Sequence, residues 1–155
     1  MLMNPGGAIT GDLFHTPTGV AFADLTINGE RRTWAIRSNT FRAWLRRSHY
    51  EATGTALDAA ALRSTLDLLE ARALFDAPQR AVHVRIAEHA GHIYLDLADD
   101  RWRAVEIGPD GWRVIGFPPV RFRRPAGMLP IRQSEEDRSK RSLPFSICRA
   151  EMTLC

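Results

Sequence analysis

Arginines are the side chains of this sequence best suited to hold a ligand, and they gather in two clusters. The first cluster extends from residue 31 to residue 47, with Glu30 as its neighbouring acid. Arginine suits phosphate because its planar fork donates two hydrogen bonds and stays charged. The members are Arg31, Arg32, Arg37, Arg42, Arg46 and Arg47. Arg37, Arg42 and Arg46 are therefore candidate phosphate contacts, and the alternative is the solvated face of an amphipathic helix.

The second cluster interleaves arginine with aromatic residues towards the end of the domain. Aromatic rings on a sheet can stack unpaired bases while arginines follow the phosphate backbone. A half-buried sheet face with arginine stems covering its rings is the structural alternative. The cluster comprises Arg101, Trp102, Arg103, Trp112, Arg113, Arg121, Phe122, Arg123 and Arg124. From it we take Arg121, Arg123 and Arg124 as candidate phosphate contacts and Trp112 as a candidate stacking residue.

Histidines offer a third kind of chemistry, metal binding. His83, His89 and His92 surround a predicted turn, and Asp96 follows on the face of His92. Imidazoles and a carboxylate would suit zinc, with His83 and His92 opposed across the hairpin. However, the sequence has no second ligand group such as C-x-x-C. The interpretation preferred from the sequence is that no metal or other cofactor is bound.

Catalytic motifs are missing from the sequence. It contains no phosphate loop, no dinucleotide-binding glycine motif, no nucleophile elbow and no metalloprotease helix. Asp99 and Asp100 are typical turn formers rather than a general acid and base. We therefore expect a protein that is not an enzyme.

Composition is that of an ordinary globular domain: 155 residues, of which 45% are hydrophobic and 25% charged. The net charge is only +3, and Lys140 is the sole lysine. A GC-rich genome also favours arginine over lysine, so arginine content alone is weak support for nucleic-acid binding. Both cysteines, Cys148 and Cys155, lie near the end of the sequence and form no disulfide framework. With no signal peptide and no membrane-spanning stretch, the sequence predicts a cytoplasmic protein.

The elements that must position these residues begin with a hairpin. Asn28-Gly29 predicts a type I′ turn between strands at 20–27 and 32–36. Ser38 can cap a helix that ends near Thr53 at Gly54. Thr55 or Asp58 can cap a second helix, which Pro78 closes off. Its apolar stripe predicts a core element: Ala59, Leu62, Leu66, Leu69 and Ala73. A helix-turn-helix is less favoured, because this helix has only Arg63 and Arg72 as basic residues.

An antiparallel β-meander follows the helices, with strands expected at 82–86, 93–97, 102–107 and 112–115 and a short edge strand at 120–123. Alternation places Val82, Val84 and Ile86 on one face and His83 and Arg85 on the other. The predicted class is α+β: an N-terminal β-hairpin, two helices, then a four-stranded meander packed on the helices. Residues 1–12 are expected to be a flexible lead-in and 13–130 a single domain. The largely charged 131–155 is expected to be a linker-like or disordered tail.

Several short blocks, taken in order, resemble one known group of proteins. The blocks are Leu13-Phe14-His15 with Pro17 and Gly19, Thr33-Trp34-Ala35-Ile36-Arg37-Ser38, Phe41-Arg42 with Trp44-Leu45, Val82-His83-Val84-Arg85, Ala87-Glu88-His89, Ile93-Tyr94-Leu95-Asp96-Leu97, Trp102-Arg103-Ala104-Val105-Glu106-Ile107, Gly111-Trp112 and Pro118-Pro119-Val120-Arg121-Phe122-Arg123-Arg124-Pro125. Together they resemble the region before the P-loop ATPase module in primase/helicase-like proteins of phages, prophages and other mobile elements. The resemblance spans residues 12–130.

That resemblance implies a setting in DNA replication and brings no catalytic residues with it. Those proteins continue into their ATPase beyond the segment at 128–130, whereas this sequence has about 25 further residues. We therefore expect a non-enzymatic, nucleic-acid-associated accessory domain without the motor, with DNA and a replication ATPase or helicase as partners. The alternative is a protein-interaction or self-association domain that positions a neighbouring ATPase without touching nucleic acid. A metal-dependent hydrolase at the histidines is a third hypothesis.

Overall fold

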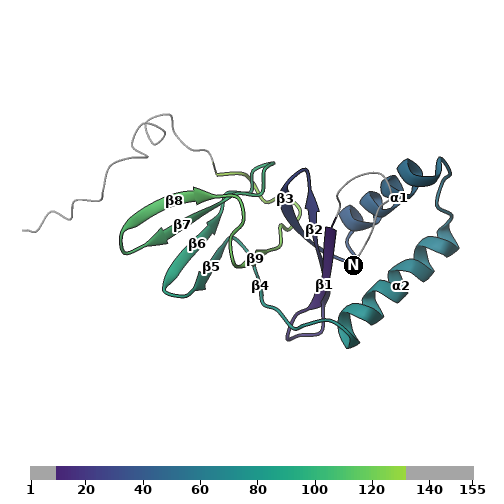
Figure 1. Ribbon diagram of the computed structural model, residues 1–155, viewed down its shortest axis with the longest axis horizontal. Coiled ribbons are helices and arrows are strands. Elements are labelled where there is room, and N and C mark those ends of the chain that lie inside the picture. Colours follow the sequence, from purple (N-terminus) through teal and green to yellow (C-terminus); the bar gives the residue numbers. More distant parts are fainter. Residues whose placement is uncertain (1–9, 132–155) are drawn as a thin grey trace, which may run out of the picture.

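A three-stranded antiparallel sheet opens the computed structural model, which describes residues 10–131 (Figure 1). Its strands are β1 (Thr10–His15), β2 (Ala21–Ile27) and β3 (Glu30–Ala35), in that order across the sheet. The β2–β3 hairpin confirms the predicted turn, since Asn28 and Gly29 both have positive φ, 53° and 78°. Residues 1–9 of the predicted lead-in (1–12) and residues 132–155 of the predicted tail (131–155) lie outside the described residues.

Strand β1 was not predicted: residues 10–12 were placed in the flexible lead-in, and no strand was expected at 13–15. The stretch Thr-Gly-Asp-Leu-Phe-His has little strand character of its own. It nevertheless pairs with β2 along its whole length, from Thr10 with Thr26 to His15 with Ala21. Phe14 is fully buried and stacks on Phe22, with ring centroids 5.6 Å apart. Pairing with β2, rather than local strand propensity, therefore stabilises this strand.

Two helices cover the first sheet. Helix α1 (Asn39–Thr53) begins where the Ser38 hydroxyl accepts a hydrogen bond from the Phe41 amide, and it ends at Gly54 with φ 71°. Helix α2 (Ala59–Phe75) is capped by Asp58, the second of the two expected residues. The predicted stripe is buried at Leu62, Leu66, Leu69 and Ala73, but not at Ala59. It packs with Leu25, Ile36 and Phe41 in the main core.

The second sheet is the predicted four-stranded antiparallel meander. It comprises β5 (Ile86–His89), β6 (His92–Asp96), β7 (Ala104–Gly108) and β8 (Gly111–Ile115), paired in sequence order. With the first sheet and the helices, it confirms the α+β class and the order of elements. Its core is small: Ala87, Tyr94, Ala104, Val120 and Phe122, with Ile115 packed against them.

The first predicted meander strand is broken in two. Arg85 adopts φ 68°, which ends β4 (Val82–His83) and redirects the chain into β5. The expected common face of Val82, Val84 and Ile86 is therefore wrong, and Ala87 is the residue of β5 that is buried. Strand β4 instead pairs in parallel with β9 (Arg121–Phe122), which was expected as an edge strand of the meander.

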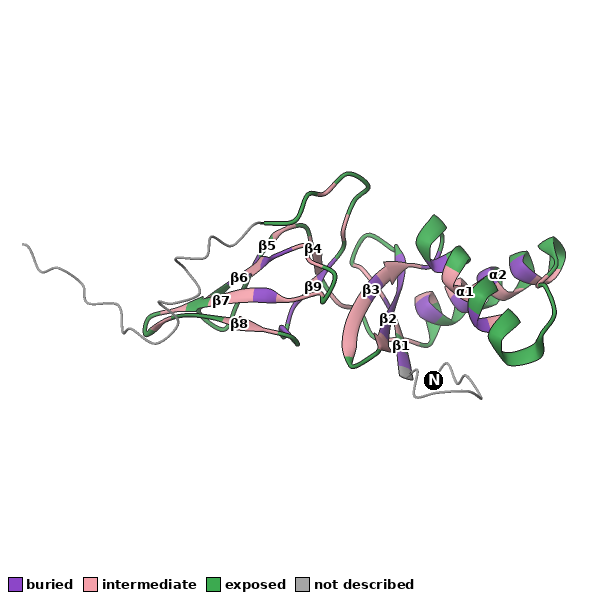
Figure 2. Cartoon of the chain, turned by 90° about the horizontal axis from the view of Figure 1, so that it is seen from above, coloured by how far each residue is buried: buried purple, intermediate pink, exposed green. Residues whose placement is uncertain are grey.

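The meander does not pack on the helices as predicted. Helix α2 lies against β1 and β2, and α1 lies against β3, so the first sheet already covers the apolar faces of both helices. Figures 1 and 2 show the three-stranded sheet between the helices and the four-stranded sheet. The molecule therefore has two lobes: β1–β3 with α1 and α2, and β5–β8 with β4 and β9.

Buried and half-buried charges join the two lobes. Asp24, in the middle of β2 and 6% exposed, accepts hydrogen bonds from the Thr33 hydroxyl at 2.6 Å and from Arg121 Nε at 2.9 Å. Arg80 Nη1 lies 3.7 Å from the same carboxylate. Arg31 Nη2 donates to the carbonyl oxygens of Pro118 and of Val120, the latter at 2.7 Å. Burial lowers the pKa of Arg31, and the nearby Asp24 opposes that shift.

None of the helices in residues 10–131 is both long enough and apolar enough to cross a bilayer.

Asp24→Ala is expected to lower the free energy of unfolding by about 3 kcal/mol, because it leaves several partly buried guanidinium groups without their carboxylate. Urea unfolding followed by circular dichroism measures the change. Asp100→Ala is the control, since Asp100 is an exposed turn residue, and it should shift stability by less than about 0.5 kcal/mol. Equal stability of the two variants would contradict a structural role for Asp24.

Candidate nucleic-acid interface

The predicted phosphate contacts Arg121 and Arg124 both have carboxylate partners inside the protein. Arg121 binds Asp24 at the junction of the lobes. Arg124 forms a two-pronged pair with Asp96, from Nε at 2.9 Å and from Nη2 at 2.6 Å. Asp96 is 1% exposed, and the guanidinium of Arg124 lies 4.0 Å from the centre of the Trp102 ring. These arginines are therefore structural, and neither offers an unneutralised charge to phosphate.

Three of the six arginines in the first cluster form ion pairs as well. Arg37 binds Glu70 through Nε at 3.0 Å and Asp67 through Nη2 at 2.6 Å, and these bonds, that to Glu70 foremost, raise the pKa of Arg37. Arg32 pairs with Glu30, and Arg47 with Glu51. Arg42 and Arg46 differ: both are exposed, and neither forms an ion pair with any residue between 10 and 131.

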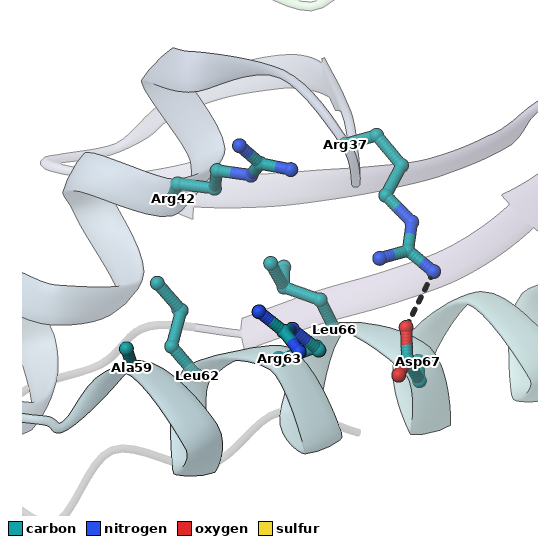
Figure 3. A pocket seen from close by; sticks show the side chains of 7 residues that line it. All are labelled: Arg37, Arg42, Ala59, Leu62, Arg63, Leu66 and Asp67. Carbon is teal, nitrogen blue, oxygen red and sulfur yellow. Dashed lines mark hydrogen bonds and ion pairs between the residues drawn. The ribbon is translucent and has the colours of Figure 1, made fainter.

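Arg42 lines a groove of about 320 Å³ between the two helices. Figure 3 shows Arg37 and Arg42 on one side of this groove and Arg63 of α2 on the other. Arg63 is exposed and has no carboxylate partner within the described part of the chain. The sequence reasoning missed it, because α2 was expected only as a core helix. Its position one residue after the buried Leu62 could have indicated the edge of the apolar stripe.

Arg42, Arg46 and Arg63 therefore form a positive surface, here called the helical arginine surface. Arg42 and Arg46 follow one another by one turn of α1, about 5.4 Å along the axis. Arg63 faces Arg42 from α2 across the groove, and Arg37 beside it pairs with two carboxylates, Asp67 and Glu70. Guanidinium groups without a carboxylate partner can bind phosphate oxygens at no cost in broken ion pairs.

Trp112 lies apart from this surface. It is on β8, 41% exposed, and its cross-strand partner is Ile107 on β7. The hollow that it lines also contains Glu106 and Asp110 as well as Arg113. Glu106 binds Arg113 and Tyr94, which lower the pKa of Glu106. The structure therefore does not bring Trp112 together with the arginines of the helices.

Arg123 is the predicted contact that remains exposed in the second lobe. No residue in the described range 10–131 forms an ion pair with it. It lines a cleft between the lobes together with Trp102. The sequence had grouped these two residues, but it gave the stacking role to Trp112.

The histidines do not form the arrangement considered for zinc. The register pairs His92 with His89 rather than with His83, which lies on β4 beside Phe122. Asp96 uses its carboxylate oxygens on Arg124 and on the Ala98 amide. Residues 10–131 contain no group of three side chains placed to hold a metal ion.

Comparison with family models, with characterised proteins and with solved structures gives no match for this chain. The resemblance to primase/helicase-like proteins therefore stays a prediction.

Arg124→Ala is expected to destabilise the fold by about 3 kcal/mol, because it leaves the buried Asp96 carboxylate unpaired. The neighbouring Arg123→Ala should change stability by less than about 0.5 kcal/mol, because Arg123 is exposed. Thermal or urea unfolding of both variants measures the difference. A structural role for Arg124 would be contradicted if the two adjacent substitutions had the same effect.

Proposed function

We propose that this chain is a non-enzymatic accessory domain that binds nucleic acid within a primase/helicase-like replication system of a mobile element. The observation that supports it most directly is the helical arginine surface. There, Arg42, Arg46 and Arg63 stay exposed without a carboxylate partner among the described residues, whereas half of the arginines in residues 10–131 form ion pairs. A cytoplasmic setting and a replication ATPase as partner belong to the same proposal, and they rest on the sequence alone.

Charge, rather than base recognition, would dominate this binding. Guanidinium groups that replace counterions on phosphate give an affinity that depends on salt but little on sequence. If the three arginines each neutralise one phosphate of a duplex, the logarithm of affinity falls with the logarithm of salt with a slope of about −2.7. The dissociation constant should then rise about 40-fold between 50 and 200 mM salt.

Arg63→Glu tests this surface against Arg72→Glu, a matched change on the same helix. Arg72 is also exposed, and nine residues further along α2 it points to the opposite side. Arg63→Glu is expected to weaken duplex DNA binding at least tenfold and to lower the salt slope by about 1 or more, because a phosphate contact becomes a repulsion. Fluorescence anisotropy with labelled DNA measures both quantities.

The double variant Arg42→Glu/Arg46→Glu should abolish binding near 50 mM salt, while Arg72→Glu should bind like the unmodified chain. The proposal is overturned if the unmodified chain does not bind DNA at low salt. It is also overturned if Arg63→Glu and Arg72→Glu weaken binding equally, because that would show only the effect of net charge.

A second candidate function, self-association, is favoured by the outer face of the four-stranded sheet. The register places Ile86, Leu95, Val105 and Val114 in one cross-strand row. The next row contains Ile93, Ile107 and Trp112, with Glu88 as its one charge. Ile86 is 60% exposed and Ile93 48%, and Figure 2 shows little burial over much of this sheet.

Exposed apolar patches that are contiguous commonly mark protein interfaces. The small core packs on the other side of the sheet, where Ala87, Tyr94 and Ala104 point. An apolar face with a single carboxylate at its corner is complementary to a second copy of itself, because face-to-face contact would bury few charges. This observation supports a homodimer, which would position a neighbouring ATPase whether or not nucleic acid is bound.

Ile107→Lys is expected to keep the chain monomeric, whereas the unmodified chain should increase in mass with concentration. A lysine in the middle of the face would have to be buried without a partner. Size-exclusion chromatography with light scattering across a concentration series measures the mass. Leu68→Lys is the control, because Leu68 is an exposed apolar residue of α2. An unmodified chain that stays monomeric throughout would exclude this second function.

A further inference from the structure

A cleft of about 1080 Å³ lies between the two lobes. Its first wall is formed by the β1–β2 loop, by β3 and by the start of α1, and it includes Trp34. The opposite wall is formed by Ala81, Val82 and Trp102 with residues 123–126. Cavities at the junction of two structural units are frequent ligand sites, and this volume can hold a molecule of nucleotide size.

The lining of the cleft has positive charge and no carboxylate. Its charged members are Arg123 and Arg124, and its other polar members are hydroxyl and amide side chains such as Thr16, Ser38 and Asn39. Asp96 balances Arg124, so the unneutralised charge is that of Arg123. This wall is therefore electrostatically suited to bind an anionic group of a ligand.

Trp102 is held on this wall in a strained conformation. Its φ of 53° lies in the left-handed region, which is unfavourable for a bulky residue that is not glycine. The Trp102 amide donates to the Asp99 carbonyl at 3.2 Å, and the guanidinium of Arg124 stacks 4.0 Å from the ring centre. Strain of this kind persists only where the surroundings enforce it, and it concentrates at functional sites.

The Trp102–Arg124 stack presents two flat groups of the kind that bind unpaired bases. Indole rings and guanidinium planes both stack on bases in single-stranded nucleic-acid complexes. Arg123, the next residue along, supplies the free positive charge beside them. A flat base attached to a phosphate matches both features, whereas a duplex keeps its bases paired and out of reach.

We propose that this cleft binds a nucleoside phosphate, with the base against the Trp102–Arg124 stack and the phosphate on Arg123. The unit is either a free nucleotide or one residue of a single strand. As a single-strand site the proposal extends the nucleic-acid function proposed above, but it uses residues separate from the helical arginine surface.

The test titrates the full chain with a mononucleotide, with labelled oligothymidine and with inorganic phosphate, by calorimetry or anisotropy. Arg123→Glu should weaken oligothymidine or mononucleotide binding at least tenfold, because it reverses the phosphate contact. Arg101→Glu is the matched control, since Arg101 is exposed on the same lobe but does not line the cleft. It should bind like the unmodified chain.

Trp102→Ala should lose about tenfold in affinity, in keeping with the contribution of one base–aromatic stack. Trp102→Phe, which keeps a ring beside Arg124, should recover part of that loss. Circular dichroism identifies any Trp102 variant that fails to fold. In that case the Arg123→Glu variant, whose side chain is exposed, still tests the proposal. Binding of the mononucleotide identifies a free nucleotide as ligand, and binding of the oligomer alone identifies a single strand.

Three outcomes would overturn the cleft proposal: no binding of either ligand, equal effects of Arg123→Glu and Arg101→Glu, or inorganic phosphate binding as tightly as the nucleotide. Arg63→Glu separates the two proposals. If it weakens duplex binding while Arg123→Glu leaves all binding unchanged, the helical arginine surface stands and the cleft does not. The reverse pattern supports the cleft and overturns the duplex-binding surface.

Discussion

Two buried carboxylates, Asp24 and Asp96, organise this arginine-rich fold. Asp24 lies in the central strand of the first sheet and binds Arg121 from the opposite lobe. Asp96 ends β6 and binds Arg124, which in turn lies on Trp102. A buried carboxylate is costly unless it is paired, so each one fixes the position of its arginine. The segment at 121–124 is therefore held from both sides, and the relation between the lobes depends on it.

This pairing changes what the arginine content means for function. From the sequence, six arginines in two clusters were candidate phosphate contacts, although arginine content alone was weak support for nucleic-acid binding. In the folded chain Arg121 and Arg124 hold the structure together, and Arg37, in the turn between β3 and α1, pairs with Asp67 and Glu70 of α2. Of the arginines predicted as phosphate contacts, Arg42, Arg46 and Arg123 stay exposed without a carboxylate partner in residues 10–131, which is a much narrower basis for binding.

Local signals in the sequence predicted much of the fold. Asn28-Gly29, the caps at Ser38 and Asp58 and the apolar stripe of α2 each act within a few residues, and each was confirmed. The features that were missed depend on distant residues. Strand β1 forms because β2 is there to pair with it. Likewise, arginines such as Arg103 and Arg124 cannot be assigned a structural or a functional role until the carboxylates that they bind are known. Pairing across the fold, rather than residue type, separates a structural arginine from a free one.

The cleft follows from the same division into two cores. Each sheet buries its own apolar residues, so the lobes meet through ion pairs such as Asp24–Arg121 and a few hydrogen bonds such as Arg31 to the Val120 carbonyl. Arg124 lines one wall of that cleft, and within its own lobe it binds Asp96 and the Asp99 carbonyl. The pairing of Asp96 with Arg124 thus also sets the position of Trp102, because the Trp102 ring lies on the Arg124 guanidinium, and the shape of this cleft wall depends on that pair.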